Sequence, residues 1–355
     1  MNLSDRLRPA PLAGARLEFV TRQLAALLNA GVPLERVLLA LSRQADRPQV
    51  RELFESLRIS VREGSSLSQA LGRYPKVFSA SYQGLVSAGE RSGRLAFVLE
   101  RLADALEAQN QLRNTLLTAL AYPVIVAVVA LAIVMLLMGY VVPQVVGVLS
   151  AQKQALPLLT VILIAVSDFL ANWGAWLALL LLLGSGLAVF SVVRMPAFRL
   201  RVDAALLKLP GAGRMLMLSE AARFASTLSI LLGGGMAMTA ALSLTARASS
   251  NRWIASRLEL VAGWVREGAD LGRGLERAEA FPPLLVQMVM TGEKSGELQT
   301  LLEVASKEFA RELKLRSQLL AAILEPALIL VMGGLVLAIV LAVMMPLIEM
   351  NSLIR

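Results

Sequence analysis

The chain has 355 residues, enough for two or three domains, of which 56% are hydrophobic and only 17% charged. Soluble globular proteins carry about 25% charged residues, so this composition indicates a membrane protein. There is no cysteine and no histidine, which excludes disulfides, thiolate nucleophiles, Cys/His zinc sites and histidine acid–base chemistry.

The net charge of +9 is divided between two blocks. Residues 1–115 hold 16 Lys/Arg and 11 Asp/Glu, and residues 194–318 hold 17 and 12, whereas 116–193 contain only Lys153 and Asp168. Mixed charges on either side of apolar segments are typical of solvated helices at a cytoplasmic membrane surface. Aromatic residues make up only 5%, so we expect no nucleic-acid partner.

The chain begins with MNLSDRLRPAPLAG, which lacks the continuous apolar core of a signal peptide. Apolar residues then recur at three- and four-residue spacing in 16–28, 34–41 and 95–106, which predicts helices. Pro48 suits a helix first turn, and no segment alternates as a strand does. The sequence therefore predicts an all-α fold with helical bundles.

Three uncharged runs are long enough to cross a bilayer. They lie between Arg113 and Lys153, over Phe169–Val193 and over Pro326–Ile348, and a crossing needs about 20 helical residues. Arginines and lysines on the short flanks predict that both charged blocks lie in the cytoplasm and that the C-terminus lies on the opposite side of the membrane. The predicted parts are an N-terminal lead (1–15), bundle 1 (16–115), transmembrane helix 1 (118–142), an extracytoplasmic connection with a short apolar helix (143–172), transmembrane helix 2 (173–193), bundle 2 (194–318), transmembrane helix 3 (322–346) and an extracytoplasmic tail (347–355).

An internal duplication organises these parts. Val61-Arg-Glu-Gly64 returns 204 residues later as Val265-Arg-Glu-Gly268, and GERSGRL (89–95) returns 203 residues later as GEKSGEL (292–298). Pro123 and Pro143 match Pro326 and Pro346 at the same shift of 203. Each copy is a bundle followed by a span, and two copies with one orientation require a return crossing between them.

The prolines and the repeated phrase carry further expectations. Proline is disfavoured inside a helix, so Pro123 and Pro326 are expected at the edges of spans. In the phrase, Gly89 is expected to end one helix in the left-handed conformation and Ser92 to cap the next. Glu90 and Glu293 are either held locally at a helix N-terminus or contact a partner or a cation.

Other candidate sites are weaker. GEKS lacks the order of a nucleotide-binding P-loop, and Gly333-Gly334 suits close helix packing. Glu325 is either an interfacial anchor or a buried functional acid. We expect no catalytic, cofactor or metal residue, and the structural or interaction candidates are Gly89, Glu90, Ser92, Gly93, Gly292, Glu293, Ser295, Gly296, Pro123, Glu325 and Pro326.

Taken together, these features resemble the F component of type II secretion and its homologues in type IV pilus assembly. The residues that carry the resemblance are Gly31-Val32-Pro33, both GE-x-SG phrases, Tyr122-Pro123, Glu325-Pro326, 156–170 and the tail PLIEMN (346–351). The resemblance implies a non-enzymatic platform in the bacterial inner membrane. Its implied partners are a secretion ATPase, the L and M components, pseudopilins, membrane lipids and further copies of the chain.

The sequence departs from the family pattern at two points, and three other functions are considered. Many family members begin with several dozen extra residues, and the second copy has Gly235-Met236-Ala237 where the first has Gly31-Val32-Pro33. A type IV pilus platform is the nearest alternative. A transporter would require polar residues within the spans, and a receptor would require an extracytoplasmic domain.

Overall fold

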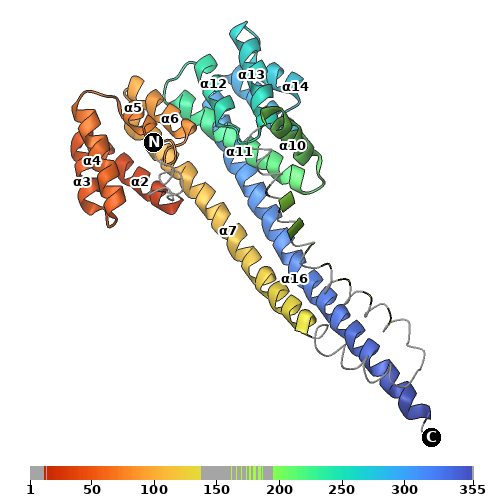
Figure 1. The fold of residues 1–355 in the computed structure, drawn as a ribbon. Helices are drawn as coiled ribbons and strands as arrows, with labels where there is room; N and C mark the ends of the chain where they lie inside the picture. Colours follow the sequence, from red (N-terminus) through yellow and green to blue (C-terminus); the bar gives the residue numbers. More distant parts are fainter. Residues whose placement is uncertain are drawn as a thin grey trace. The chain divides into compact units, whose positions relative to one another are not determined.

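The computed structural model describes residues 14–136 and 195–353, with Leu12 and a few isolated positions between 161 and 186. Every regular element in these residues is a helix, which confirms the predicted all-α fold (Figure 1). The first series comprises α2 (Ala15–Asn29), α3 (Leu34–Gln44), α4 (Pro48–Arg62), α5 (Leu67–Gly72), α6 (Ala80–Arg91) and α7 (Leu95–Leu136). The second comprises α10 (Pro196–Lys208), α11 (Ala212–Gly233), α12 (Met238–Ala248), α13 (Arg252–Arg266), α14 (Leu271–Ala278), α15 (Pro283–Ser295) and α16 (Leu298–Leu353).

The helices repeat with the shift that the sequence predicts. The starts of α3, α4 and α5 return 204 residues later as the starts of α12, α13 and α14. The starts of α6 and α7 return 203 residues later as those of α15 and α16. The single deletion therefore lies between the start of α14 and the start of α15, and the internal repeat is a repeat of whole helices.

The chain divides into two compact units. One unit joins residues 1–114 to residues 199–315, and the other joins 115–198 to 316–355. The long helices α7 and α16 each pass from the first unit into the second without a break. Both helical series up to these points thus belong to one compact body.

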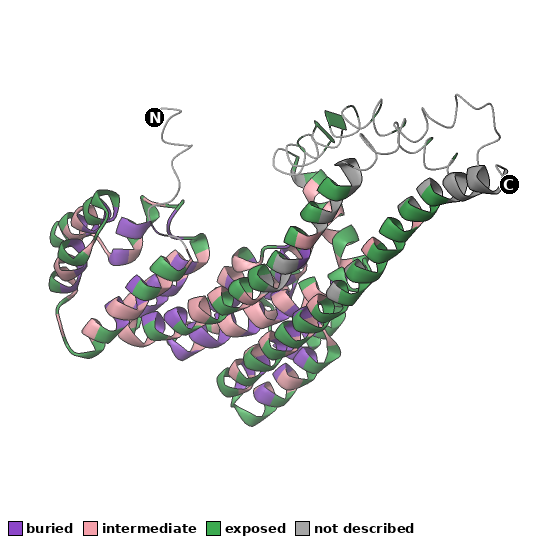
Figure 2. Cartoon of the chain, turned by 90° about the horizontal axis from the view of Figure 1, so that it is seen from below, coloured by how far each residue is buried: buried purple, intermediate pink, exposed green. Residues whose placement is uncertain are grey.

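Amphipathic helices form the core of this first unit. On α4 the buried residues are Val50, Leu53, Phe54 and Leu57, at the three- and four-residue spacing that places them on one face. Most other helices of both copies contribute similar stripes, so buried side chains concentrate in the bundles, as Figure 2 shows. Pro48 is the first residue of α4, as its sequence position predicts.

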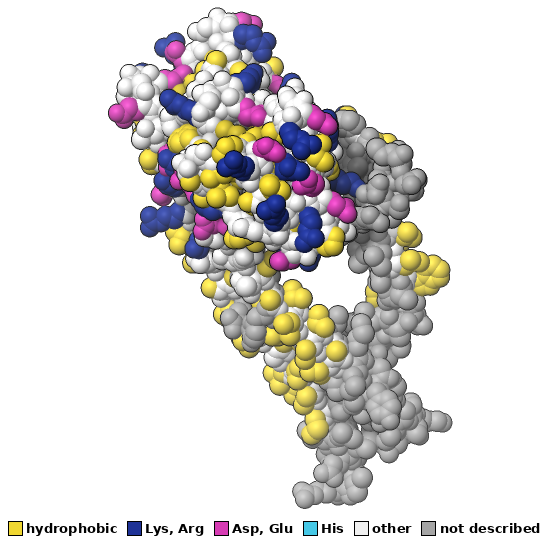
Figure 3. Space-filling view, turned by 90° about the vertical axis from the view of Figure 1, so that its left-hand side faces the viewer, with side chains coloured by type: hydrophobic (Ala, Val, Ile, Leu, Met, Phe, Trp, Pro, Cys, Tyr) yellow, Lys and Arg dark blue, Asp and Glu magenta, His cyan; other side chains and the backbone are white. Residues whose placement is uncertain are grey.

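The far parts of the long helices are apolar and exposed. On α7 the exposed large residues include Val124, Ile125, Val128 and Ile133. In the face drawn in Figure 3, charged side chains gather over the bundles, and hydrophobic side chains cover the described part of a long helix. Such a surface is suited to lipid rather than water.

Within the described residues, two helices are long and apolar enough to cross a membrane by length and composition. One is the segment Leu298–Ala338, which overlaps the predicted third span and contains an 18-residue window with a mean hydropathy of 2.3. The other is α11, whose apolar window is half buried in the first unit, as expected of a core helix. The predicted count of three spans is therefore not confirmed, and most of the second span and its preceding connection lie outside the described residues.

The prolines do not end the helices. Pro123 lies inside α7, and α16 continues through Pro326 and Pro346. A proline removes one backbone hydrogen bond, and the rest of a helix of this length supports the turn around it. These residues therefore mark positions along continuous helices and do not show where a span begins.

Candidate functional site: the repeated helical corner

The repeated phrase forms the corner between two helices in each copy. Helix α6 ends at Arg91 and α7 begins at Leu95, while α15 ends at Ser295 and α16 begins at Leu298. The predicted helix–turn–helix corner is thus present twice, and in each copy the long helix begins at the leucine that ends the phrase.

The second glycine of the phrase takes the left-handed conformation. Gly93 has a φ angle of 69° and Gly296 one of 75°, which suit a residue without a Cβ atom. The expectation that Gly89 ends its helix in this way is wrong, since Gly89 lies inside α6. The helix continues to Arg91 because the left-handed residue follows the last helical turn.

Gly89 and Gly292 instead allow the two helices of the corner to approach closely. A Cβ atom on Gly89 would lie 3.0 Å from Leu95 Cα, and one on Gly292 would lie 2.8 Å from Leu298 Cα. Backbone atoms cannot move aside as a flexible side chain can. The first glycine of the phrase is therefore required by helix contact.

The serines also differ from the prediction. The Ser92 hydroxyl donates to the carbonyl oxygen of Ala88 at 2.9 Å, so it closes the end of α6 and does not cap α7. The Ser295 hydroxyl accepts a long hydrogen bond, 3.4 Å, from the amide of Glu297 beside the start of α16. The prediction that Ser92 caps the next helix is therefore wrong, and Ser295 bonds only the residue before α16.

The two glutamates of the phrase hold the N-termini of the short helices α5 and α14. Each carboxylate accepts hydrogen bonds from two successive backbone amides, and one carboxylate oxygen serves each amide. Free amides at a helix N-terminus favour a negative charge, which makes this contact a charged cap. Glu90 accepts from the amides of Leu67 and Ser68. Glu293 accepts from the amides of Leu271 and Gly272, and each of these two nitrogen–oxygen distances is 2.6 Å.

This geometry favours the local role over the alternative that was left open for Glu90 and Glu293. Both oxygens of each carboxylate are already engaged by amides of the same copy. In the described ranges, no group of three or more acidic side chains is placed to hold a metal ion. Each corner thus connects a short helix, α5 or α14, with the long helix of the same copy, α7 or α16.

In the first copy, the corner also packs against the second copy. The carbonyl oxygen of Gly233 at the end of α11 accepts a hydrogen bond of 3.1 Å from Arg94. A Cβ atom on Gly234 would lie 3.1 Å from Val98 Cγ2, so the end of α11 approaches α7 closely. We call this contact, made by residues 94–98 and 233–235, the bundle contact.

An ion pair extends the bundle contact along the long helices. Arg101 on α7 and Glu303 on α16 lie 2.9 Å apart at their nearest nitrogen and oxygen. Lys307, one turn further along α16, also reaches Glu303 at 2.8 Å. The hydrogen bond from Lys307 is the main cause that lowers the pKa of Glu303, and the charge of Arg101 lowers it further.

The bundle contact is not repeated in the opposite direction. Arg94 corresponds to Glu297 and Phe97 to Thr300 at the shift of 203, and both counterparts are exposed. A carboxylate cannot donate to a carbonyl oxygen as a guanidinium does. The first copy therefore presents its corner to the second, and the second presents a polar corner to solvent.

Sequence reasoning missed Arg94 and the glycines at the end of α11. The signal was present in the comparison of the two copies, where Gly233-Gly234-Gly235 replaces Asn29-Ala30-Gly31. Two of these glycines have negative φ, so backbone conformation alone does not require them. Close approach of the other copy does.

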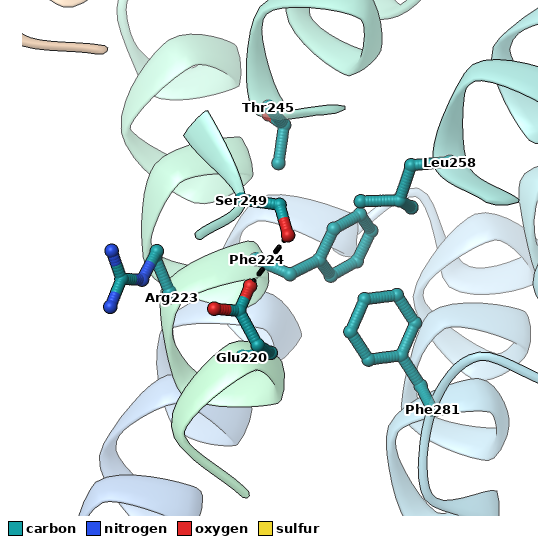
Figure 4. A pocket seen from close by; sticks show the side chains of 7 residues that line it. All are labelled: Glu220, Arg223, Phe224, Thr245, Ser249, Leu258 and Phe281. Carbon is teal, nitrogen blue, oxygen red and sulfur yellow. Dashed lines mark hydrogen bonds between the residues drawn. The ribbon is translucent and has the colours of Figure 1, made fainter. Parts of the chain in front are cut away.

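A second cluster lies at the end of α12, around Glu220 (Figure 4). Its carboxylate accepts hydrogen bonds from the Ser249 hydroxyl at 2.7 Å and the Ser250 amide at 3.2 Å. Phe224 and Phe281 pack beside it with their ring centroids 4.7 Å apart. The side chains leave no space between them that a water molecule would fill, so this buried acid anchors a loop and forms no binding pocket.

The remaining candidates lie on the long helices. Pro326 is exposed on α16, and Gly333-Gly334 meet no other atom within 4 Å of an added Cβ. The Glu325 side chain lies outside the described residues, so both of its alternative roles stay predictions. Close packing at Gly333-Gly334 likewise stays a prediction.

Both copies of the repeat match the sequences of known proteins. The family profile of type II secretion system (T2SS), protein F, matches residues 20–143 and again residues 224–346. These two segments cover most of each helical series and reproduce the internal repeat. They account for more than half of the chain.

Individual proteins are similar over nearly the whole chain. Type II secretion system protein F of Pseudomonas aeruginosa is 40% identical over 97% of this chain and 84% of its own length. The protein of the same name from Vibrio cholerae is 39% identical over 95% of this chain and 83% of its own. Type IV pilus assembly protein PilC of Thermus thermophilus is 36% identical, with coverages of 93% and 81%.

Proposed function

The chain belongs to the type II secretion system protein F family, and from this premise we propose that it is the inner-membrane platform that couples a cytoplasmic ATPase to pseudopilus assembly. The observation that carries the proposal is the match of the family profile to both helical series. It is supported by 40% identity over 97% of the chain to a protein of that name. The proposed role is that of a scaffold without enzymatic activity.

The repeated corners suit a platform mechanically. Each corner joins a short bundle helix to a long helix through a charged cap and a close glycine contact. Since α7 and α16 run on without a break, a rotation of the bundles is transmitted along both helices. We propose that partner motions reach the membrane through these two helices.

The proposed topology keeps the sequence-based boundaries. Bundles 16–115 and 194–318 lie in the cytoplasm, the spans are 118–142, 173–193 and 322–346, and the C-terminus is periplasmic. The exposed apolar residues of α7 and α16 support the first and third spans. The distribution of Lys and Arg supports the orientation.

The proposed partners follow from this position. We infer contacts of the bundles with a secretion ATPase, contacts with the L and M components of the inner membrane, and contacts of the spans with pseudopilins, lipids and other copies of the chain. Family membership supports partners within the secretion system. The individual contacts are proposals.

A type IV pilus platform is the second candidate, supported by the similarity to PilC of Thermus thermophilus. Deletion in the native host separates the two. If the proposal is right, exported enzymes accumulate in the periplasm while surface pili remain, and a plasmid-borne copy restores export. Loss of pili with normal export would transfer the chain to pilus assembly.

A crosslinking experiment tests the coupling itself. The chain has no native cysteine, so a single cysteine at an exposed bundle position gives a specific site for a photoactivatable crosslinker. We expect the crosslink pattern to differ between cells with an active ATPase and cells with an ATPase variant that binds but does not hydrolyse ATP. An identical pattern would contradict coupling and leave only a static scaffold.

A further inference from the structure

A groove lies where the two copies meet. It is formed by α5 and α6 of the first copy and α12 of the second, and its volume is about 430 Å³. This is within the range of about 300–1,000 Å³ that is usual for ligand sites. At one side of the groove, Gly84 on α6 lies close to Leu244 on α12, with 3.1 Å from an added Cβ to Leu244 Cδ2.

Small side chains of the first copy keep the groove open. Ala80, Gly84 and Ser87 line it on α6. Their counterparts in the second copy, 203 residues later, are Pro283, Gln287 and Met290. An added Cβ on Gly272 would lie only 2.4 Å from the Met290 side chain, so the larger residue closes the equivalent surface there. The duplicated fold alone therefore does not produce the groove, because it needs the small side chains that only the first copy has on α6.

The lining mixes apolar and polar groups and carries one charge. Arg247 on α12 borders the groove, together with Ser68, Gln69 and Gln83. In the part of the chain that the structure describes, no acidic side chain pairs with Arg247. The lining contains no aromatic ring on which a nucleotide base would stack.

The helix N-terminus beside the groove is not free to bind an anion. The amides of Leu67 and Ser68 at the start of α5 are already bound by Glu90. A phosphate group usually requires several such amides or more than one cation. A single guanidinium with neutral polar neighbours matches one carboxylate, and the hydroxyl and amide side chains match the polar backbone of a peptide.

We propose that this groove binds a short acidic segment of a partner protein, with one carboxylate held by Arg247. The site is assembled from both copies, so binding requires that the bundles be docked as in this structure. The proposal goes beyond the platform role and does not depend on it. The recognition of a carboxylate by Arg247 would be the same whatever the function of the chain.

The test uses the full chain in detergent and an array of short peptides in which Glu occurs in varied neutral backgrounds. Each peptide is paired with its Gln counterpart, and retained peptides are titrated by fluorescence anisotropy. We expect Glu peptides to bind preferentially and Arg247→Ala to weaken them about tenfold or more, which is the usual value of a charged hydrogen bond. Ser87→Met, which introduces the residue of the second copy, is expected to weaken them similarly by filling the groove.

The matched control is Arg43→Ala, because Arg43 is the counterpart of Arg247, 204 residues earlier, on α3. It removes the same charge from an equivalent helix end away from the groove, and binding should stay unchanged. Arg247→Gln provides a second variant, and circular dichroism checks that each variant is folded. The proposal is overturned if no Glu peptide is preferred over its Gln counterpart, if Arg247→Ala and Arg247→Gln bind as the wild type does, or if inorganic phosphate alone binds with the same dependence on Arg247.

Discussion

Glycine has two different tasks within seven residues of the repeated phrase. Gly93 and Gly296 supply a left-handed backbone, whereas Gly89 and Gly292 supply space for the next helix. The sequence predicts the corner because the phrase is written twice. It does not tell which glycine has which task, since both tasks select for the absence of a side chain.

Alanine at the first glycine separates the two tasks. Gly292→Ala is expected to destabilise the chain by about 1–3 kcal/mol, because the new Cβ meets the backbone of Leu298 and forces the helices apart. Thermal unfolding of the detergent-solubilised chain, followed by circular dichroism, measures this change.

A helical glycine with open space around it provides the control. Gly263 on α13 has no atom within 4 Å of an added Cβ, and Gly263→Ala is expected to stabilise the chain by about 0.5–1 kcal/mol. Equal effects of the two substitutions would show that close approach at the corner does not matter.

The charged caps give a second prediction at this scale. Glu90→Gln and Glu293→Gln keep the shape of the side chain but place an amide group against backbone N–H donors. Each is expected to cost about 1–2 kcal/mol, the usual range for losing a cap. Glu259→Gln, on the exposed surface of α13, is the control in the same unfolding measurement. Unchanged stability of both corner variants would contradict the role of the carboxylates.

Tyr82 predicts how the first bundle responds to alkaline pH. Its ring is buried, and this burial raises the pKa of Tyr82 from 10.0 to about 12, although the hydrogen bond with Thr21 acts in the opposite direction. The unfolded chain releases this proton near pH 10 and the folded chain near pH 12. The contribution of Tyr82 is therefore complete below pH 10 and is lost as the pH rises toward 12.

Replacing the phenol tests this dependence. Tyr82→Phe is expected to flatten the fall in unfolding temperature between pH 10 and about 12, at a cost of about 1 kcal/mol or less near neutrality for the lost hydrogen bond. Tyr74→Phe removes another hydroxyl of the same bundle, one that donates to Ser56, and serves as the control. An equally steep fall in Tyr82→Phe would exclude Tyr82 as a cause.

At the scale of elements, the sequence predicts much of the bundles and little of their contact. Helix periodicity and the repeat are local signals, and the structure places helices where they predict them. The contact depends on differences between copies, such as Arg94 against Glu297 and Phe97 against Thr300. The sequence alone does not show which corner is covered, because an exposed and a covered corner have the same local structure. The differences can be interpreted only once the facing surface of the other copy is known.

Exchanging residues between the copies tests the bundle contact. The double variant Arg94→Glu, Phe97→Thr gives the first corner the residues of the second, which removes the hydrogen bond to Gly233 and an apolar ring beside it. We expect crosslinking between cysteines placed at Ser87 and Leu244, which face the same groove, to fall severalfold. Thr300→Ala, at the exposed corner of the second copy, should leave crosslinking unchanged. Full crosslinking in the double variant would contradict the asymmetric contact.

At the scale of the whole molecule, the apolar stretches of the sequence predict where a bilayer is needed but not how the helices meet it. The prediction that prolines mark the edges of spans stays a prediction, because α7 and α16 pass through the prolines as single helices and a helix can extend beyond the bilayer. A water-exposed helix and a lipid-exposed helix have the same backbone. Only the side chains distinguish them, so the boundaries along a continuous helix are set by the membrane itself.

Cysteine labelling in spheroplasts tests the orientation that the duplication requires. Single cysteines replace Ser92 and Ser295, the exposed serines of the two corners, and Lys153, between the first two predicted spans. A membrane-impermeant maleimide is expected to label position 153 in intact spheroplasts and positions 92 and 295 only after the membrane is opened. Both bundles lie on the same side of the membrane only if the chain crosses it an even number of times between them. The first two predicted spans provide these two crossings, and position 153 lies between them on the other side. Labelling of positions 92 and 295 from opposite sides would remove the return crossing, and with it the arrangement in which both bundles act on one cytoplasmic partner.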